Sequence, residues 1–229
     1  MRTIQFRSFA LAALASVALT ASAAAQDRAS GLLNTVELRQ LVDRGDPGDH
    51  AQLSAHFTML GERYSTEAKR HTSMAQSYVG NPRGNLVAGM SVHCKRLADL
   101  NTQSAMTVRE LAAYHQKAAA GTSATPPRGG TRFEGGAGAQ EPTERELNAL
   151  AAKASTPAEH RGLEEYFLTL AKRYTAEATA HATMAQTYRG TRIAQAAVHH
   201  DRLVTLSRDA AKEANEAAAM HTQLAGIAR

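Results

Sequence analysis

The sequence predicts an all-α protein: two antiparallel helical hairpins, each preceded by a short helix, that pack as a four-helix bundle. The 229 residues are rich in alanine and include no tryptophan, five phenylalanines and six tyrosines, which disfavours β-sandwiches and barrels. Apolar residues recur at steps of three and four along extended stretches, as in helix seams. The chain also repeats itself, and this internal duplication sets the number of hairpins.

The first 25 residues predict a secretory signal peptide. Arg2 and Arg7 give a basic start, the run from Phe9 to Leu19 is apolar, and alanines 23–25 match a small-residue cleavage site. The apolar run is too short to anchor the chain in a bilayer. We therefore expect cleavage near Ala25, a periplasmic or secreted location and no transmembrane anchor in the mature chain.

The charge and the cysteine content each exclude one possibility, a nucleic-acid partner and an intramolecular disulfide. The chain carries 26 Lys and Arg against 21 Asp and Glu, and the two signs are mixed. This mild balance predicts no nucleic-acid partner. The one cysteine, Cys94, excludes an intramolecular disulfide, so the fold must depend on helix packing.

The duplication aligns residues 46–80 with 156–190 and residues 91–120 with 197–226. Fifteen of the 35 positions in the first alignment are identical, and the matched His, Tyr, Glu and Met do not follow from an alanine bias. The predicted organisation is a signal peptide over 1–25, hairpin repeat 1 over 26–120, a flexible Gly/Pro linker over 121–141 and hairpin repeat 2 over 142–229.

Local signals predict the helices in order. Short helical patterns at 32–44 and 143–154 precede the hairpins, the second with a capping box from Thr143 to Glu146. The long first helix of each hairpin starts at an N-cap followed by proline and stops at glycine. These starts and stops are Asp46-Pro47 and Gly80 in repeat 1, and Thr156-Pro157 and Gly190 in repeat 2. The second long helices are expected at about 86–120 and 193–225.

Eight of the ten histidines belong to the repeat and predict facing pairs. In an antiparallel hairpin, residues at the same height have numbers that add to a nearly constant total. The predicted pairs are His71–His93 and His50–His115 in the first hairpin, and His181–His199 and His160–His221 in the second. Each hairpin would then hold two levels of imidazoles about 30 Å apart.

One interpretation of these levels is transition-metal binding, with copper or zinc as the ion. Neutral imidazole binds both ions, and thioether sulfur favours Cu(I). A glutamate and a methionine lie one turn before and one turn after His71 and, in the second hairpin, His181. Arg96 and Arg202 are expected nearly level with these glutamates. The candidate ligands are His50, His71, His93, His115, His160, His181, His199, His221, Glu67, Glu177, Met74 and Met184.

Two other interpretations stay open. The histidines can simply set helix register in a structural or interaction module of the cell envelope. Paired imidazoles can also make the fold pH-responsive, because they repel once both are protonated at about pH 5–6. Cys94, which stands where the second repeat has His200, is interpreted as a small packing residue. Since spacing fixes no nucleophile or acid–base set, we expect no enzyme activity.

The second repeat carries the pattern Thr156-Pro157-Ala158-Glu159-His160, then Glu177-Ala178-x-x-His181-x-x-Met184-Ala185-x-x-Tyr188, then His199 and Arg202-Leu203. This pattern resembles alanine-rich exported helical-hairpin proteins of bacteria, a family of unknown function. In the first repeat Asp46 and Asp49 replace the Thr and Glu of the helix start. The resemblance covers both hairpins but not the linker, and it implies a helical fold and export but no activity.

Overall fold

A computed structural model describes residues 32–81, 84–120 and 142–228, and within these ranges all regular secondary structure is helical. The all-α prediction is therefore confirmed. The expected signal peptide at 1–25 and the expected linker at 121–141 lie outside the described residues. The helices are α2 (Thr35–Arg44), α3 (Pro47–Val79), α4 (Gly84–Ala120), α5 (Glu144–Lys153), α6 (Pro157–Arg189) and α7 (Ala196–Ile227).

The predicted helix starts are built as their sequences indicate. In α6 the Thr156 hydroxyl accepts the Glu159 N–H at 3.3 Å, and the Glu159 carboxylate accepts the Thr156 N–H at 2.9 Å. Thr143 and Glu146 form the same reciprocal cap at α5. Such caps satisfy N–H groups that the first helical turn leaves without partners. Proline at the first position of α3 and of α6 restricts the backbone angle φ to a value that suits a helix.

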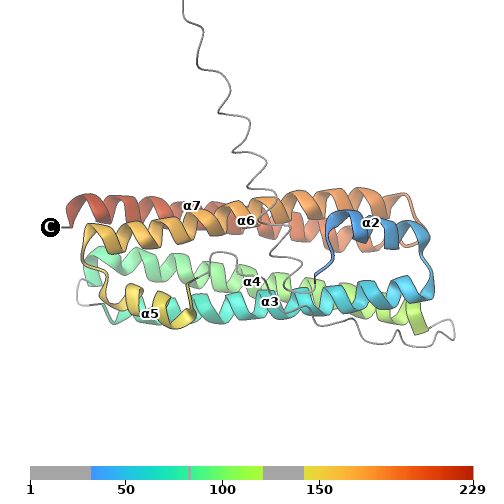
Figure 1. Cartoon of the computed structure of the whole chain (residues 1–229), viewed down its shortest axis with the longest axis horizontal. Helices are drawn as coiled ribbons and strands as arrows, with labels where there is room; N and C mark the ends of the chain where they lie inside the picture. Colours follow the sequence, from blue (N-terminus) through green and yellow to red (C-terminus); the bar gives the residue numbers. More distant parts are fainter. Residues whose placement is uncertain (1–31, 82–83, 121–141, 229) are drawn as a thin grey trace, which may run out of the picture.

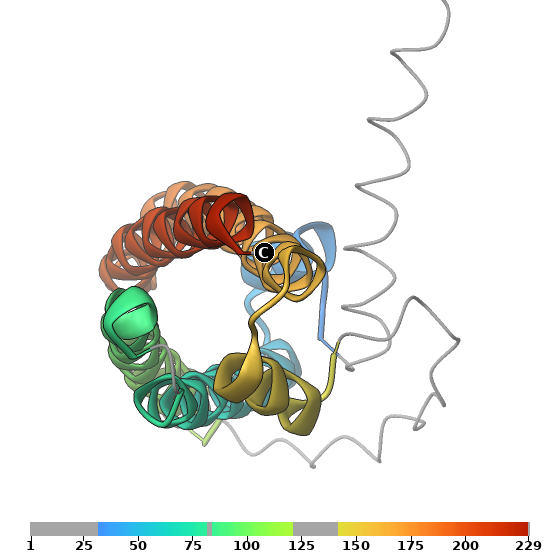
Figure 2. The same cartoon turned by 90° about the vertical axis from the view of Figure 1, so that its left-hand side faces the viewer.

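The four long helices form one bundle. Helix α3 packs along α4, α6 packs along α7, and α4 lies against α7. The two hairpins run in opposite directions, so their loops lie at opposite ends of the bundle (Figure 1). Figure 2, a view along the bundle, shows the short helices on the side between α3 and α6. Helix α2 contacts both α3 and α6 at one end, and α5 does so at the other.

Two apolar clusters fill the interior, and each needs both hairpins. The α2-side core joins the first half of α3 and the second half of α4 to the loop end of α6 and α7, with α2 as its cover. The α5-side core joins the loop end of α3 and α4 to the first half of α6 and the second half of α7, with α5. The hairpins therefore share their cores and are not separate units. None of the helices in the described ranges has the length and apolar character that a membrane crossing requires.

Candidate functional site: paired histidines in the bundle core

Two of the predicted histidine pairs form as expected. Nδ1 of His50 on α3 lies 3.0 Å from Nδ1 of His115 on α4. In the second hairpin, Nδ1 of His160 on α6 lies 3.2 Å from Nδ1 of His221 on α7. All four side chains are buried. A nitrogen–nitrogen separation of this length holds one proton, so each pair is an N–H···N hydrogen bond between neutral imidazoles.

A tyrosine from the opposite hairpin reaches the outer nitrogen of each of these pairs. The Tyr188 hydroxyl lies 2.9 Å from Nε2 of His115, and the Tyr78 hydroxyl lies 2.9 Å from Nε2 of His221. The hydroxyl can donate or accept, so it fits either tautomer of the imidazole. Phe57 and Phe167 stack on His115 and His221, with ring planes 15° and 16° apart. Each imidazole is thereby held in one orientation.

The third pair is His181 with His200, and the predicted partner His199 is wrong. Nδ1 of His181 lies 3.2 Å from Nδ1 of His200. One residue turns a helix by about 100°, so His199 points away from α6 and its Nδ1 lies 3.3 Å from a carboxylate oxygen of Glu110 on α4. The spacing in the sequence does indicate the correct partner. His200 precedes His221 by the same number of residues that separates His160 from His181, so the pairs His160–His221 and His181–His200 share one register.

The predicted pair His71–His93 is wrong for the same reason. His93 points across to α7, where its Nδ1 lies 2.6 Å from Oε1 of Glu213. The residue of α4 that corresponds to His200 is Cys94, which is fully buried. His71 is fully buried too, and neither of its ring nitrogens has a hydrogen-bond partner among the residues that the structure describes. This fourth level thus differs from the other three.

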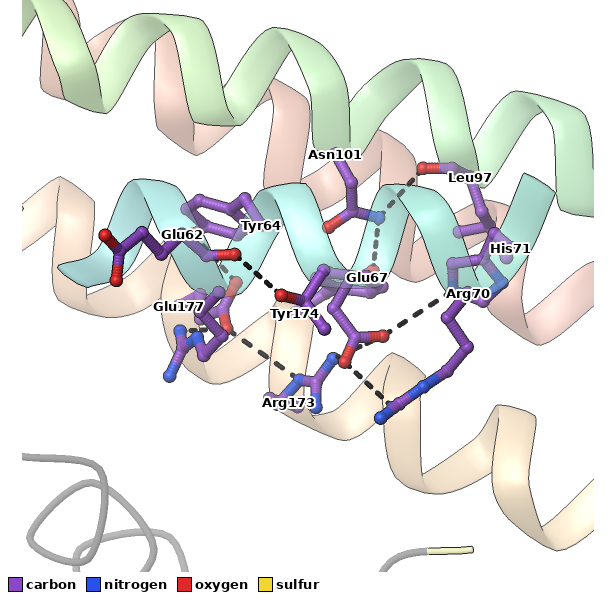
Figure 3. A network of polar contacts seen from close by, with 12 residues as sticks. Glu62, Tyr64, Glu67, Arg70, His71, Leu97, Asn101, Arg173, Tyr174 and Glu177 are labelled. Carbon is purple, nitrogen blue, oxygen red and sulfur yellow. Dashed lines mark hydrogen bonds and ion pairs between the residues drawn. The ribbon is translucent and has the colours of Figure 1, made fainter. Parts of the chain in front are cut away.

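The two candidate glutamates belong to an ion-pair network between α3 and α6, shown in Figure 3. Glu177 accepts a hydrogen bond from Arg63 at 2.6 Å, and Glu67 lies 3.3 Å from Arg173. These arginines come from the opposite hairpin. Arg96, which was expected nearly level with Glu67, lies 3.3 Å from Glu213 on α7.

Other contacts complete this network. Glu67 accepts a hydrogen bond from Arg70 at 2.9 Å, and Glu177 accepts one from the Tyr64 hydroxyl at 2.9 Å. Burial alone raises the pKa of Glu67, but Arg173 and Arg70 outweigh that effect and hold the pKa below its usual range. Both carboxylates are neutralised by arginine, which makes them poor metal ligands.

Burial keeps the core histidines uncharged. It lowers the pKa of His115, His181 and His221 from 6.5 to about 3, and that of His71 to about 4. The cost of removing an imidazolium from water is the main cause in every case. At neutral pH these rings therefore retain the lone pairs that a metal ion needs.

The remaining candidates lie elsewhere. Met74 and Met184 are buried in the α5-side and α2-side cores, one turn beyond His71 and His181. Within the described ranges, one group of three potential ligands meets the distance limits of a metal site: His93, Glu213 and Glu216, whose ligand atoms lie within 4.8 Å of one another. Arg96 lies 3.3 Å from Glu213 and supplies a competing positive charge, which weighs against a cation there.

Comparison of the chain with protein-family models, with curated proteins and with solved structures found no match. The resemblance to exported helical-hairpin proteins stays a prediction.

Proposed function

We propose that the protein is an exported helical bundle of the bacterial envelope that binds Cu(I) through buried histidine pairs. The observation that supports metal binding is the convergence of two Nδ1 atoms in three pairs, at 3.0–3.2 Å. Export is supported by the signal-peptide pattern of the first 25 residues.

The two nitrogens of a pair lie close enough to share an ion after a limited side-chain movement. Two nitrogens that hold a two-coordinate ion from opposite sides at about 2.0 Å each lie about 4 Å apart, so a separation of the two rings by about 1 Å would admit Cu(I) in place of the shared proton. The outer nitrogens of His115 and His221 already contact tyrosine hydroxyls. Contacts of this kind orient metal-binding imidazoles in proteins.

The number of ligands and the charge favour Cu(I) over Zn²⁺. Each pair offers two nitrogens, whereas zinc sites in proteins are almost always four-coordinate. Cu(I) accepts two ligands. It also brings a single positive charge into a buried site of neutral rings, which costs less than a double charge.

An anaerobic Cu(I) titration against a chromophoric chelator tests this proposal. The variant His115→Gln, His200→Gln, His221→Gln removes one member of each pair and keeps a polar side chain. We expect it to lose the Cu(I) equivalents that the wild-type protein holds through the pairs. His56→Gln is the matched control, since His56 is also buried but lies outside the pairs, with Nδ1 accepting the Leu33 N–H at 3.1 Å. Unchanged binding by the triple variant would reject the proposal.

A second candidate function is a structural or interaction module in which the histidines set helix register. The observation that favours it is that His115 and His221 have contacts at both ring nitrogens. On this reading, replacing His50 and His115 together by leucine leaves stability unchanged or increased, because a buried polar pair gives way to apolar packing. Loss of the fold in this double variant would count against it.

A further inference from the structure

The first hairpin differs from the second at one of the histidine levels. Three levels hold facing imidazoles, whereas His71 stands opposite the place of a cysteine. We propose that this level is a separate soft-donor site for Cu(I), built from His71 and Cys94 with Met74 and Met90, which rests on the proposed copper function but uses none of the residues of the three pairs.

The first observation is the unpartnered imidazole. His71 has no exposed surface, and neither ring nitrogen makes a hydrogen bond to any residue in the described ranges. Oε2 of Glu67 lies 3.9 Å from Nε2 of His71 and is itself held by Arg173 at 3.3 Å. Buried polar atoms without partners are rare in folded proteins and call for an explanation such as a bound ion.

The second observation is the direction of that imidazole. His71 corresponds to His181, whose Nδ1 faces His200 while its Nε2 lies 3.4 Å from the Tyr64 hydroxyl beside Glu177. Nε2 of His71 lies on the side of Glu67, the counterpart of Glu177. The duplication therefore directs Nδ1 of His71 towards the position of Cys94, the counterpart of His200.

The third observation is the sulfur content of this level. Met74 lies one turn beyond His71 on α3, and Met90 lies one turn before Cys94 on α4. All three sulfur-bearing side chains have no exposed surface and belong to the α5-side core. The second repeat has Ala196 and His200 where the first has Met90 and Cys94. Thiolate and thioether ligands select Cu(I).

Charge balance also favours a monovalent ion. Burial raises the pKa of Cys94, so the side chain is a thiol in the metal-free protein. On binding, the S–H bond breaks, a Cu–S bond forms and the proton leaves to solvent. One positive charge replaces another, and the net charge of the buried level does not change. Zn²⁺ would add a positive charge near Arg70 and Arg173, which already surround Glu67.

The test is the anaerobic Cu(I) titration of the full chain, followed by absorption in the near ultraviolet, where sulfur-to-copper charge transfer appears. We expect one of the Cu(I) equivalents that the wild-type protein binds to give this absorption. Cys94→Ser keeps the side-chain volume and a hydrogen-bonding group for His71, and should lose that equivalent. Met90→Leu should keep the absorption and lower the affinity for this Cu(I) equivalent by about tenfold or more. Circular dichroism verifies that each variant is folded.

His200→Gln is the matched control, since it changes the corresponding position of the other hairpin. We expect it to retain the absorbing equivalent. If Cys94→Ser retains both the absorption and the affinity of the wild-type protein, the soft-donor site is refuted. If Cys94→Ser loses the equivalent while the triple histidine variant binds as the wild type does, the soft-donor site stands and the histidine pairs do not bind copper.

Discussion

At the scale of single residues, the molecule is defined by imidazoles that are buried without charge. Each of the three facing pairs shares one proton. The pairs His50–His115 and His160–His221 were predictable from spacing, because their members lie on the apolar seam in both copies. His200 was missed because it stands next to His199, and a difference of one residue changes the face of the helix. The unpartnered state of His71 is a property of its surroundings and is not encoded in its spacing.

The protein should lose stability as the pH falls below about 6.5. Burial lowers the folded-state pKa of His71, His115, His181 and His221 to about 3–4, against 6.5 when exposed. The unfolded chain therefore takes up more protons below pH 6.5. The stability present above that pH decreases by up to about 1.4 kcal/mol per pH unit for each such histidine. Urea unfolding at pH 7.5, 6.5, 5.5 and 4.5 measures this slope, and equal unfolding free energies at all four values would contradict it.

Tyr188→Phe should destabilise the protein by about 1–3 kcal/mol, because it leaves Nε2 of His115 buried without its partner. Tyr78→Phe, the same change at the symmetric position, should have a similar effect on His221. Tyr114→Phe is the control, since Tyr114 is partly exposed and its ring packs edge-on against His115. Chemical denaturation compares the three variants, and equal stabilities would show that the tyrosine contacts contribute nothing.

At the scale of helices, the sequence predicted most of the architecture. Caps, prolines and the heptad seam located α3 and α6 to within a residue at their starts, since these are local signals. The second long helices begin and end within a few residues of expectation. The pairing of Glu67 and Glu177 with arginines of the opposite hairpin was not predictable, because it depends on how the two hairpins meet. The way the hairpins meet is set by packing across the whole bundle, and no spacing pattern in the sequence reports it.

The network between α3 and α6 should contribute measurably to stability. Glu177→Ala removes the acceptor for both Arg63 and the Tyr64 hydroxyl in a partly buried position. We expect a loss of about 1–3 kcal/mol. Glu216→Ala serves as control, because the exposed Lys212–Glu216 contact at 3.8 Å should be worth less than about 1 kcal/mol. Thermal unfolding of the two variants, side by side, tests the difference, and equal losses would contradict it.

At the scale of the whole molecule, neither hairpin completes a core by itself. The α2-side core and the α5-side core each draw on all four long helices. A fragment of residues 142–229 should therefore be less helical than it is in the full chain, and mixing it with a fragment of residues 26–120 should restore helicity. Circular dichroism and size-exclusion chromatography of the separate and mixed fragments measure this. A fully helical, monomeric fragment 142–229 would show that the second hairpin folds independently.

The approximate two-fold relation between the hairpins has an evolutionary consequence. A dimer of identical hairpins would present the same residue at both positions occupied here by Cys94 and His200. Joining two copies in one polypeptide removes that constraint, because a mutation then alters one half and spares the other. The single polypeptide can therefore carry cysteine at one of the two equivalent positions and histidine at the other.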